Sequence, residues 1–101
     1  MAMTPEKRVK NKVVKQLKEL GNDVYYFFPA TGGYGRSGVP DIVGCYNGKF
    51  FAIECKAGKN VPTKLQELEL KAIGLAGGVP WVVNESNMDT IGDAVKSLGV
   101  R

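Results

Sequence analysis

Two segments of the chain place charged side chains inside runs that otherwise read as buried strands. Residues 39–43 (Val-Pro-Asp-Ile-Val) contain Asp41, and residues 53–56 (Ile-Glu-Cys-Lys) contain Glu54 and Lys56. An unpaired charge in a buried strand costs more free energy than its apolar neighbours return. Asp, Glu and Lys are therefore rarely buried unless they are paired. These three charges constrain the fold, because it must bring them together.

A hairpin between the two segments does this. Asn47-Gly48 lies between them, and Asn-Gly is the strongest short-range signal for a two-residue type I′ turn. The register set by this turn places Asp41 opposite Glu54, with Cβ atoms about 5 Å apart, where like charges repel. Lys56 follows Glu54 by two residues and so points to the same face. Two carboxylates and one ammonium on one face predict a divalent-cation site with a lysine beside it.

The alternative interpretation is that Glu54 and Lys56 are solvated charges on an alternating edge strand. A bulge or a longer turn would change the opposed register, but not the placement of Glu54 and Lys56 on one face. Apart from the three charges, both faces of the hairpin are apolar, which favours a strand buried on both sides. One face carries Val43, Phe50 and Ala52, and the other carries Ile42, Phe51 and Ile53.

The same residues carry a family resemblance. Residues 36–41 (Arg-Ser-Gly-Val-Pro-Asp), residues 54–56 (Glu-Cys-Lys) and residues 63–66 (Thr-Lys-Leu-Gln) resemble the VRR-NUC branch of the PD-(D/E)XK nucleases. The similarity runs from about Glu6 to Trp81. It implies one restriction-endonuclease-like domain over residues 1–101 and a metal-dependent DNA endonuclease.

The resemblance also implies roles for particular residues. Asp41, Glu54 and the backbone carbonyl of Cys55 would hold Mg²⁺ or Mn²⁺, because hard oxygen ligands suit these ions. Lys56 would orient the attacking water or neutralise charge in the transition state.

Two further residues are assigned by the resemblance and keep a second interpretation. Glu6 matches a first-helix glutamate that completes the metal site, but an acid in a first helical turn is also favoured by the helix dipole. Gln66 matches a glutamine beside the catalytic lysine, where it would hydrogen-bond a water or a phosphate oxygen. Thr63 and Gln66 also have the spacing of a capping box, in which the glutamine bonds the Thr63 backbone.

Composition narrows the chemistry. The chain has 101 residues, a formal net charge of +4 and no histidine. The positive charge suits an anionic partner such as nucleic acid. The lack of histidine excludes Ser-His-Asp triads and His-ligated zinc sites, so catalysis must use carboxylates, lysine and an oxygen-held metal.

Cys45 and Cys55 lie far apart in the hairpin register, so we expect free thiols and a cytoplasmic protein in a bacterial or phage-infected cell. No apolar stretch approaches the roughly 20 residues of a membrane span.

The pattern along the chain predicts an α/β domain of order αβββαβα, with a central mixed sheet flanked by helices. Thr4 and Pro5 open a first helix that Gly21 ends, and Thr63 opens a second that ends near Gly77-Gly78. We expect the second helix to turn Leu65, Leu68, Ala72 and Ile73 inward. Strands are predicted over residues 23–28, in the hairpin and over 79–84, and a last helix, capped by Ser86 or Asn87, extends through Leu98.

The glycine-rich loop before Asp41 contains a misleading pattern. Residues 33–38 fit GxGxxG, but that dinucleotide-binding motif requires a helix directly after it, and Val39-Pro40 enters a strand instead. The loop is either a mobile turn or a flexible segment that approaches a phosphodiester, with Tyr34 as a candidate for base stacking. The predicted DNA contacts are Arg36, Ser37, Lys59, Lys64 and Lys10.

Small stand-alone members of the VRR-NUC branch resemble phage-borne junction resolvases, so the resemblance implies branched DNA, such as a four-way junction, as the leading substrate and a homodimer that supplies two active sites for two symmetric nicks. A flap nuclease, a nonspecific nuclease, a catalytically idle DNA-binding module and a metal-free basic scaffold are the alternatives. The predicted dimer surface is the last strand and helix around Trp81 and Val83, with core packing of Trp81 as the other interpretation.

Overall fold

The computed structural model, which describes residues 3–30 and 35–99, confirms the predicted order of elements. It adds a 3₁₀ turn before the first strand and another before the last helix. The elements are α1 (Pro5–Glu19), η1 (Gly21–Asp23), β1 (Val24–Phe27), β2 (Ile42–Tyr46), β3 (Lys49–Cys55), α2 (Lys64–Leu75), β4 (Val79–Val83), η2 (Met88–Thr90) and α3 (Ile91–Ser97).

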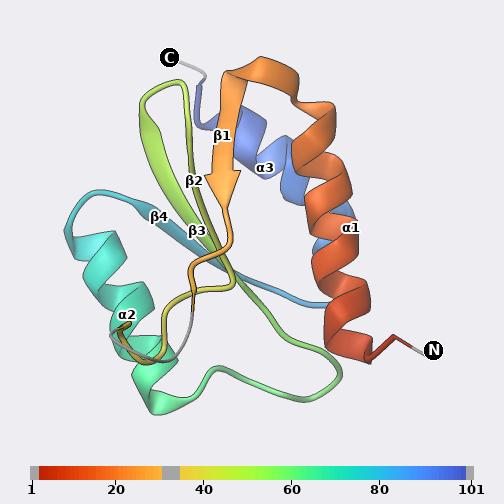
Figure 1. The fold of residues 1–101 in the computed structure, drawn as a ribbon, viewed down its shortest axis with the longest axis vertical. Helices are drawn as coiled ribbons and strands as arrows, with labels where there is room; N and C mark the ends of the chain where they lie inside the picture. The colour runs from red at the N-terminus through yellow and green to blue at the C-terminus, as the bar shows by residue number, and fades with distance from the viewer. Residues whose placement is uncertain (1–2, 31–34, 100–101) are drawn as a thin grey trace.

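One mixed sheet holds the strands in the order β1-β2-β3-β4. The pairs β1–β2 and β2–β3 are antiparallel, and β3–β4 is parallel. α1 and α3 lie on one side of the sheet and α2 lies on the other (Figure 1). Asn47 and Gly48 both have positive φ, at 47° and 84°, as a type I′ turn requires. In this order β3 lies between β2 and β4, so it is a central strand, as the apolar residues on both of its faces predicted.

The main core lies between the sheet and the pair α1 and α3. Alternate residues of β3 (Phe51, Ile53 and Cys55) are fully buried against this core. Val83 is also buried, and Trp81 packs against the core with its ring centroid 6.1 Å from that of Phe51. The prediction that Val83 lies at a dimer surface was wrong, because this side chain is buried, and Trp81 takes its second interpretation, since it packs against the core.

The two long helices begin as predicted, but α2 turns a different face inward. Thr4 and Thr63 accept hydrogen bonds from the backbone three residues later, and so cap α1 and α2. In α2 the buried residue is Leu70, whereas Leu65 and Leu68 are half exposed and Ala72 is also exposed, which corrects the predicted inward placement of these three residues. The first turn of α2 packs against Gly38 of the loop before Asp41, and positions 66, 70 and 73 share the inner face.

The last helix begins without the predicted side-chain cap from Ser86 or Asn87. The Asn87 side chain instead accepts from the Asn84 N–H at 2.8 Å and donates to the Val82 carbonyl at 3.1 Å. It thereby closes the turn after β4. Over residues 3–30 and 35–99, no helix combines the length and apolar character that a membrane crossing requires.

Candidate active site

The hairpin register brings Asp41 and Glu54 together. Ile42 pairs with Ile53, so Asp41, one residue before β2, lies opposite Glu54, one residue further along β3. Asp41 is held by its own hydrogen bond, since its Oδ2 accepts from the Cys55 backbone N–H at 2.8 Å. This hydrogen bond fixes the carboxylate at the end of the β2–β3 ladder, and its Oδ1 remains available for a further partner.

Glu54 and Lys56 are the buried charged residues of the described chain, with exposed fractions of 2% and 9%. Lys56 Nζ lies 3.5 Å from Glu54 Oε2. A buried ion pair of this length compensates only part of the cost of removing two charges from water. Burial of these two side chains is therefore a cost to folding, of the kind that functional sites carry.

The charge on Glu54 is disfavoured in this environment. The pKa of Glu54 is raised to about 7, mainly by burial and secondly by the nearby Asp41 carboxylate, while Lys56 acts in the opposite direction. The pKa of the Cys55 thiol is likewise raised to about 12, mainly by burial and also by Asp41 and Glu54, while Lys10 acts in the opposite direction. Strongly perturbed groups that share one set of neighbours are typical of functional sites.

A cavity of about 310 Å³ opens beside Asp41 and brings the first helix into the site. Thr4, Glu6, Lys7, Lys10, Asp41 and Cys55 line it. Glu6 also adds to the repulsion on Glu54, although more weakly than Asp41 does. The structure therefore places Glu6 on the same cavity as Asp41, at the N-terminal end of α1.

The donor set fits a hard divalent cation. Asp41, Glu54 and Glu6 offer carboxylate oxygens, and a cation would relieve the repulsion among them. The described residues do not gather three acidic or thiol side chains into a complete cluster. Asp41 and Glu54 are instead drawn to the Cys55 N–H and to Lys56. An ion here would take its remaining ligands from backbone carbonyls and water, as Mg²⁺ commonly does.

Comparison with known proteins decides the family. The family model for the archaeal Holliday junction resolvase (Hjc) matches residues 6–85. The chain belongs to this resolvase family. A phage protein, "Putative nuclease p44" of Acyrthosiphon pisum secondary endosymbiont phage 1, is 30% identical over 96 residues, which cover 94% of this chain and 99% of that protein. The resolvase-family chain is therefore a DNA nuclease.

Solved structures confirm the fold of this resolvase-family nuclease. One described as "VRR_NUC domain protein" has a TM-score of 0.72 at 16% identity and covers 98% of this chain and 93% of its own. A second, described as "VRR_NUC domain", has a TM-score of 0.71 at 22% identity and covers 90% and 97%. The predicted restriction-endonuclease-like α/β fold is thus confirmed.

Gln66 forms the capping box that was its second interpretation. Its Oε1 accepts from the Thr63 N–H at 2.9 Å, and Thr63 Oγ1 accepts from the Gln66 N–H at 3.3 Å. Gly38, in the loop before Asp41, packs so closely on this first turn of α2 that a Cβ there would lie 3.0 Å from the Gln66 nitrogen. Gln66 therefore lies beside the loop that carries Asp41, and its side-chain oxygen is used by the cap.

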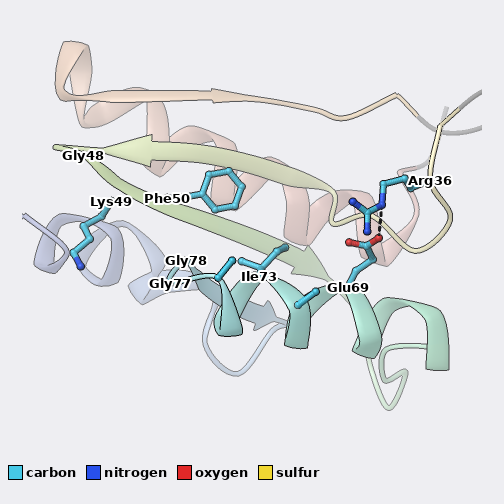
Figure 2. A pocket seen from close by; sticks show the side chains of 10 residues that line it. Arg36, Gly48, Lys49, Phe50, Glu69, Ile73, Gly77 and Gly78 are labelled. Carbon is cyan, nitrogen blue, oxygen red and sulfur yellow. Dashed lines mark ion pairs between the residues drawn. The ribbon is translucent and has the colours of Figure 1, made fainter.

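The predicted DNA contacts are spread over several surfaces. Arg36 pairs with Glu69 of α2, with Nε 2.9 Å from Oε1, at one end of a hollow of about 510 Å³ between α2 and β3 (Figure 2). Lys10 lines the cavity of Asp41, and Lys59 lines a neighbouring cavity that also includes Glu6. Ser37 and Lys64 are exposed. Gly33 and Tyr34 lie outside the described residues.

Two residues near the site were not predicted. Both carboxylate oxygens of Glu85 accept from the Gly58 N–H, at 3.0 and 3.2 Å, and so tie the turn after Lys56 to the end of β4. Phe28 lies under Lys10, whose Nζ is 4.5 Å from the ring centroid. Neither residue carries a sequence signal, because each contact joins segments far apart in the chain.

Proposed function

We propose that this resolvase-family nuclease is a metal-dependent DNA endonuclease whose active site is Asp41, Glu54 and Lys56. The observation that carries the proposal is the opposition of two carboxylates beside a buried lysine, with one of the carboxylates, Asp41, lining a cavity. This burial costs stability, and a ligand that joins the carboxylates would recover it.

Asp41, Glu54 and the Cys55 carbonyl would hold Mg²⁺ or Mn²⁺, with Glu6 across the cavity completing the site. Such an ion, when bound, lowers the pKa of water and stabilises negative charge on a phosphate. The proposal accounts for the pKa of Glu54, since a cation would return this carboxyl to its charged form at neutral pH.

The chain's own side chains supply the remaining chemistry. A water oxygen bonds to phosphorus and gives up a proton to the solvent, one P–O ester bond breaks, and the leaving oxygen takes up a proton, which leaves a phosphate on one strand end and a hydroxyl on the other. Lys56 orients that water or neutralises the charge that develops on the phosphate. The amide nitrogen of Gln66 donates to a phosphate oxygen. Lys59, Lys64, Ser37 and Arg36 contact flanking phosphates, Arg36 after it leaves Glu69.

The substrate is branched DNA, cut by a homodimer in the cytoplasm of a bacterial or phage-infected cell. A junction needs paired cuts, and a twofold dimer provides two sites. The surface left for pairing is the exposed aromatic face of the sheet, defined by Tyr25, Phe27 and Phe50. Tyr25 and Phe50 both pair with Cys45, and so lie in one row across β1, β2 and β3. The Tyr25 and Phe27 rings are 6.3 Å apart, and all three side chains are exposed.

A panel of end-labelled four-way junction, flap, single-stranded and duplex DNA, each with Mg²⁺ or with EDTA, tests the proposal. We expect paired cuts in the junction with Mg²⁺, no cleavage in EDTA, and no cleavage by Asp41→Asn. Equal cleavage of duplex and junction would leave a nonspecific nuclease. DNA binding without cleavage would leave an idle accessory module.

A further inference from the structure

Lys10 occupies an unusual position for a surface lysine. It lines the cavity of Asp41 together with Glu6, which precedes it by one helical turn on the same face of α1. The Lys10 charge opposes the rise in the pKa of the Cys55 thiol, and the Cys55 backbone N–H donates to Asp41 Oδ2. Other lysines of α1, such as Lys15 and Lys18, are exposed and line no cavity described for residues 3–30 and 35–99.

An aromatic ring, and not an acid, holds the Lys10 side chain. Its Nζ lies 4.5 Å above the centroid of Phe28, whereas no ion pair within 4 Å joins it to an acid of the described chain. The Phe28 ring is itself supported, because it packs edge-on against Tyr26 at 6.2 Å, and Tyr26 packs against the core. A cation–π contact fixes an ammonium while leaving its N–H donors free.

We propose that Lys10 binds a nonbridging oxygen of the phosphodiester that is cut, and that Phe28 is the residue that positions Lys10 there. This inference rests on the proposed nuclease function and goes beyond a general contact with flanking phosphates. An acid paired with Lys10 would have to be displaced before the phosphate bound. The ring imposes no such competition, so the ammonium is preorganised for an anion entering the cavity.

Steady-state cleavage of the junction by single variants tests the roles of the two residues. We expect Lys10→Ala to lower kcat by about 100-fold, in the range of one lost transition-state donor. Phe28→Leu, which keeps an apolar side chain but removes the ring, should lower kcat by about 10-fold. Phe28→Tyr restores a ring and should stay within about 2-fold of wild type. Lys15→Ala removes the same charge from the same helix and should leave kcat within about 2-fold.

A double variant separates positioning from a structural role. If Phe28 acts through Lys10, Phe28→Leu has no further effect on kcat in a Lys10→Ala background. Independent, multiplying losses would overturn the inference, as would equal losses in Lys10→Ala and Lys15→Ala. Far-ultraviolet circular dichroism of each variant should match wild type. A wild-type protein that cuts no DNA would overturn the proposed function, whereas active protein with unaffected Lys10 and Phe28 variants would overturn only this inference.

Discussion

At the scale of single residues, Glu54 is a buried carboxyl that lies beside a second carboxyl. Only 2% of its surface is exposed, it opposes Asp41 across the ladder, and its single cationic partner lies 3.5 Å away. Its pKa of about 7 exceeds the ordinary value of 4.5. The metal-free protein therefore favours the protonated side chain, and a bound cation would favour the charged one.

The stability of the metal-free protein should fall with pH because of Glu54. The folded pKa is raised, so its contribution is fully present below about pH 4.5 and is lost as pH rises through about 7. At about 1.4 kcal/mol per pKa unit, the loss amounts to about 3 kcal/mol. Glu54→Gln should therefore gain stability relative to wild type between pH 4.5 and pH 8, measured by urea unfolding in EDTA.

Glu67→Gln, at an exposed position of α2, is the matched control and should not gain stability relative to wild type as the pH rises. An equal pH dependence of the two variants would show that Glu54 is not held in a charge-disfavouring site.

At the scale of elements, the register of the hairpin was predictable, whereas the face that α2 turns inward was not. Asn47-Gly48 fixes its own backbone angles, so the register of β2 and β3 followed from local sequence alone. The inner face of α2 depends on how its first turn docks on the loop before Asp41, which is a tertiary contact. Leucines at helical spacing could not reveal that Leu65 and Leu68 remain exposed.

The contact between the Asp41 loop and α2 depends on Gly38. This residue has φ +78°, and a Cβ there would lie 2.7 Å from the Leu65 backbone. Gly38→Ala should cost about 3 kcal/mol of unfolding free energy and reduce cleavage, because the loop must move and take Asp41 with it. Gly21→Ala, at φ +70° with nothing within 4 Å, should cost only the backbone strain of about 1 kcal/mol. Equal costs in thermal unfolding would contradict the close docking.

Burial of β3 on both faces makes a prediction about the two cysteines. Cys55 is fully buried with a thiol pKa of about 12, whereas Cys45 is partly exposed. Because the thiolate is the reactive form, alkylation at pH 8 should label Cys45 alone in a folded variant whose dimer surface is disrupted, such as Tyr25→Lys, and both cysteines in denaturant. Mass spectrometry of the digested protein distinguishes the two, and rapid labelling of Cys55 would show that the strand is open to solvent.

At the scale of the whole molecule, the residues of the site could be predicted from sequence, whereas the contacts around them could not. The Asn-Gly turn and the alternation of side chains along the strands predicted that Asp41, Glu54 and Lys56 lie together. The partners of Arg36, Lys10 and Gly58 could not be predicted, because Glu69, Phe28 and Glu85 lie 18 or more residues away in the chain. The predicted dimer surface was also wrongly placed, since composition does not reveal which apolar side chains are buried in the core.

The exposed aromatic face predicts the oligomeric state. We expect a dimer at micromolar concentration by sedimentation velocity, and dissociation on Tyr25→Lys, because a charge is then buried at the centre of an apolar contact. Leu75→Lys, at the exposed end of α2, changes the charge equally and should leave the dimer intact. A monomeric wild-type protein, or equal effects of the two substitutions, would remove this face as the dimer surface.

The central claim is that Asp41 and Glu54 bind a metal ion while Lys56 acts on the phosphodiester. Calorimetric titration of Mn²⁺, set beside junction cleavage by the same proteins, tests it most directly. Wild type should bind and cleave, Asp41→Asn should lose at least about 10-fold in affinity together with cleavage, and Lys56→Ala should bind Mn²⁺ normally yet lose cleavage, because an ammonium is not a ligand. Loss of Mn²⁺ affinity in Lys56→Ala as large as in Asp41→Asn, or cleavage that survives Asp41→Asn, would contradict the account.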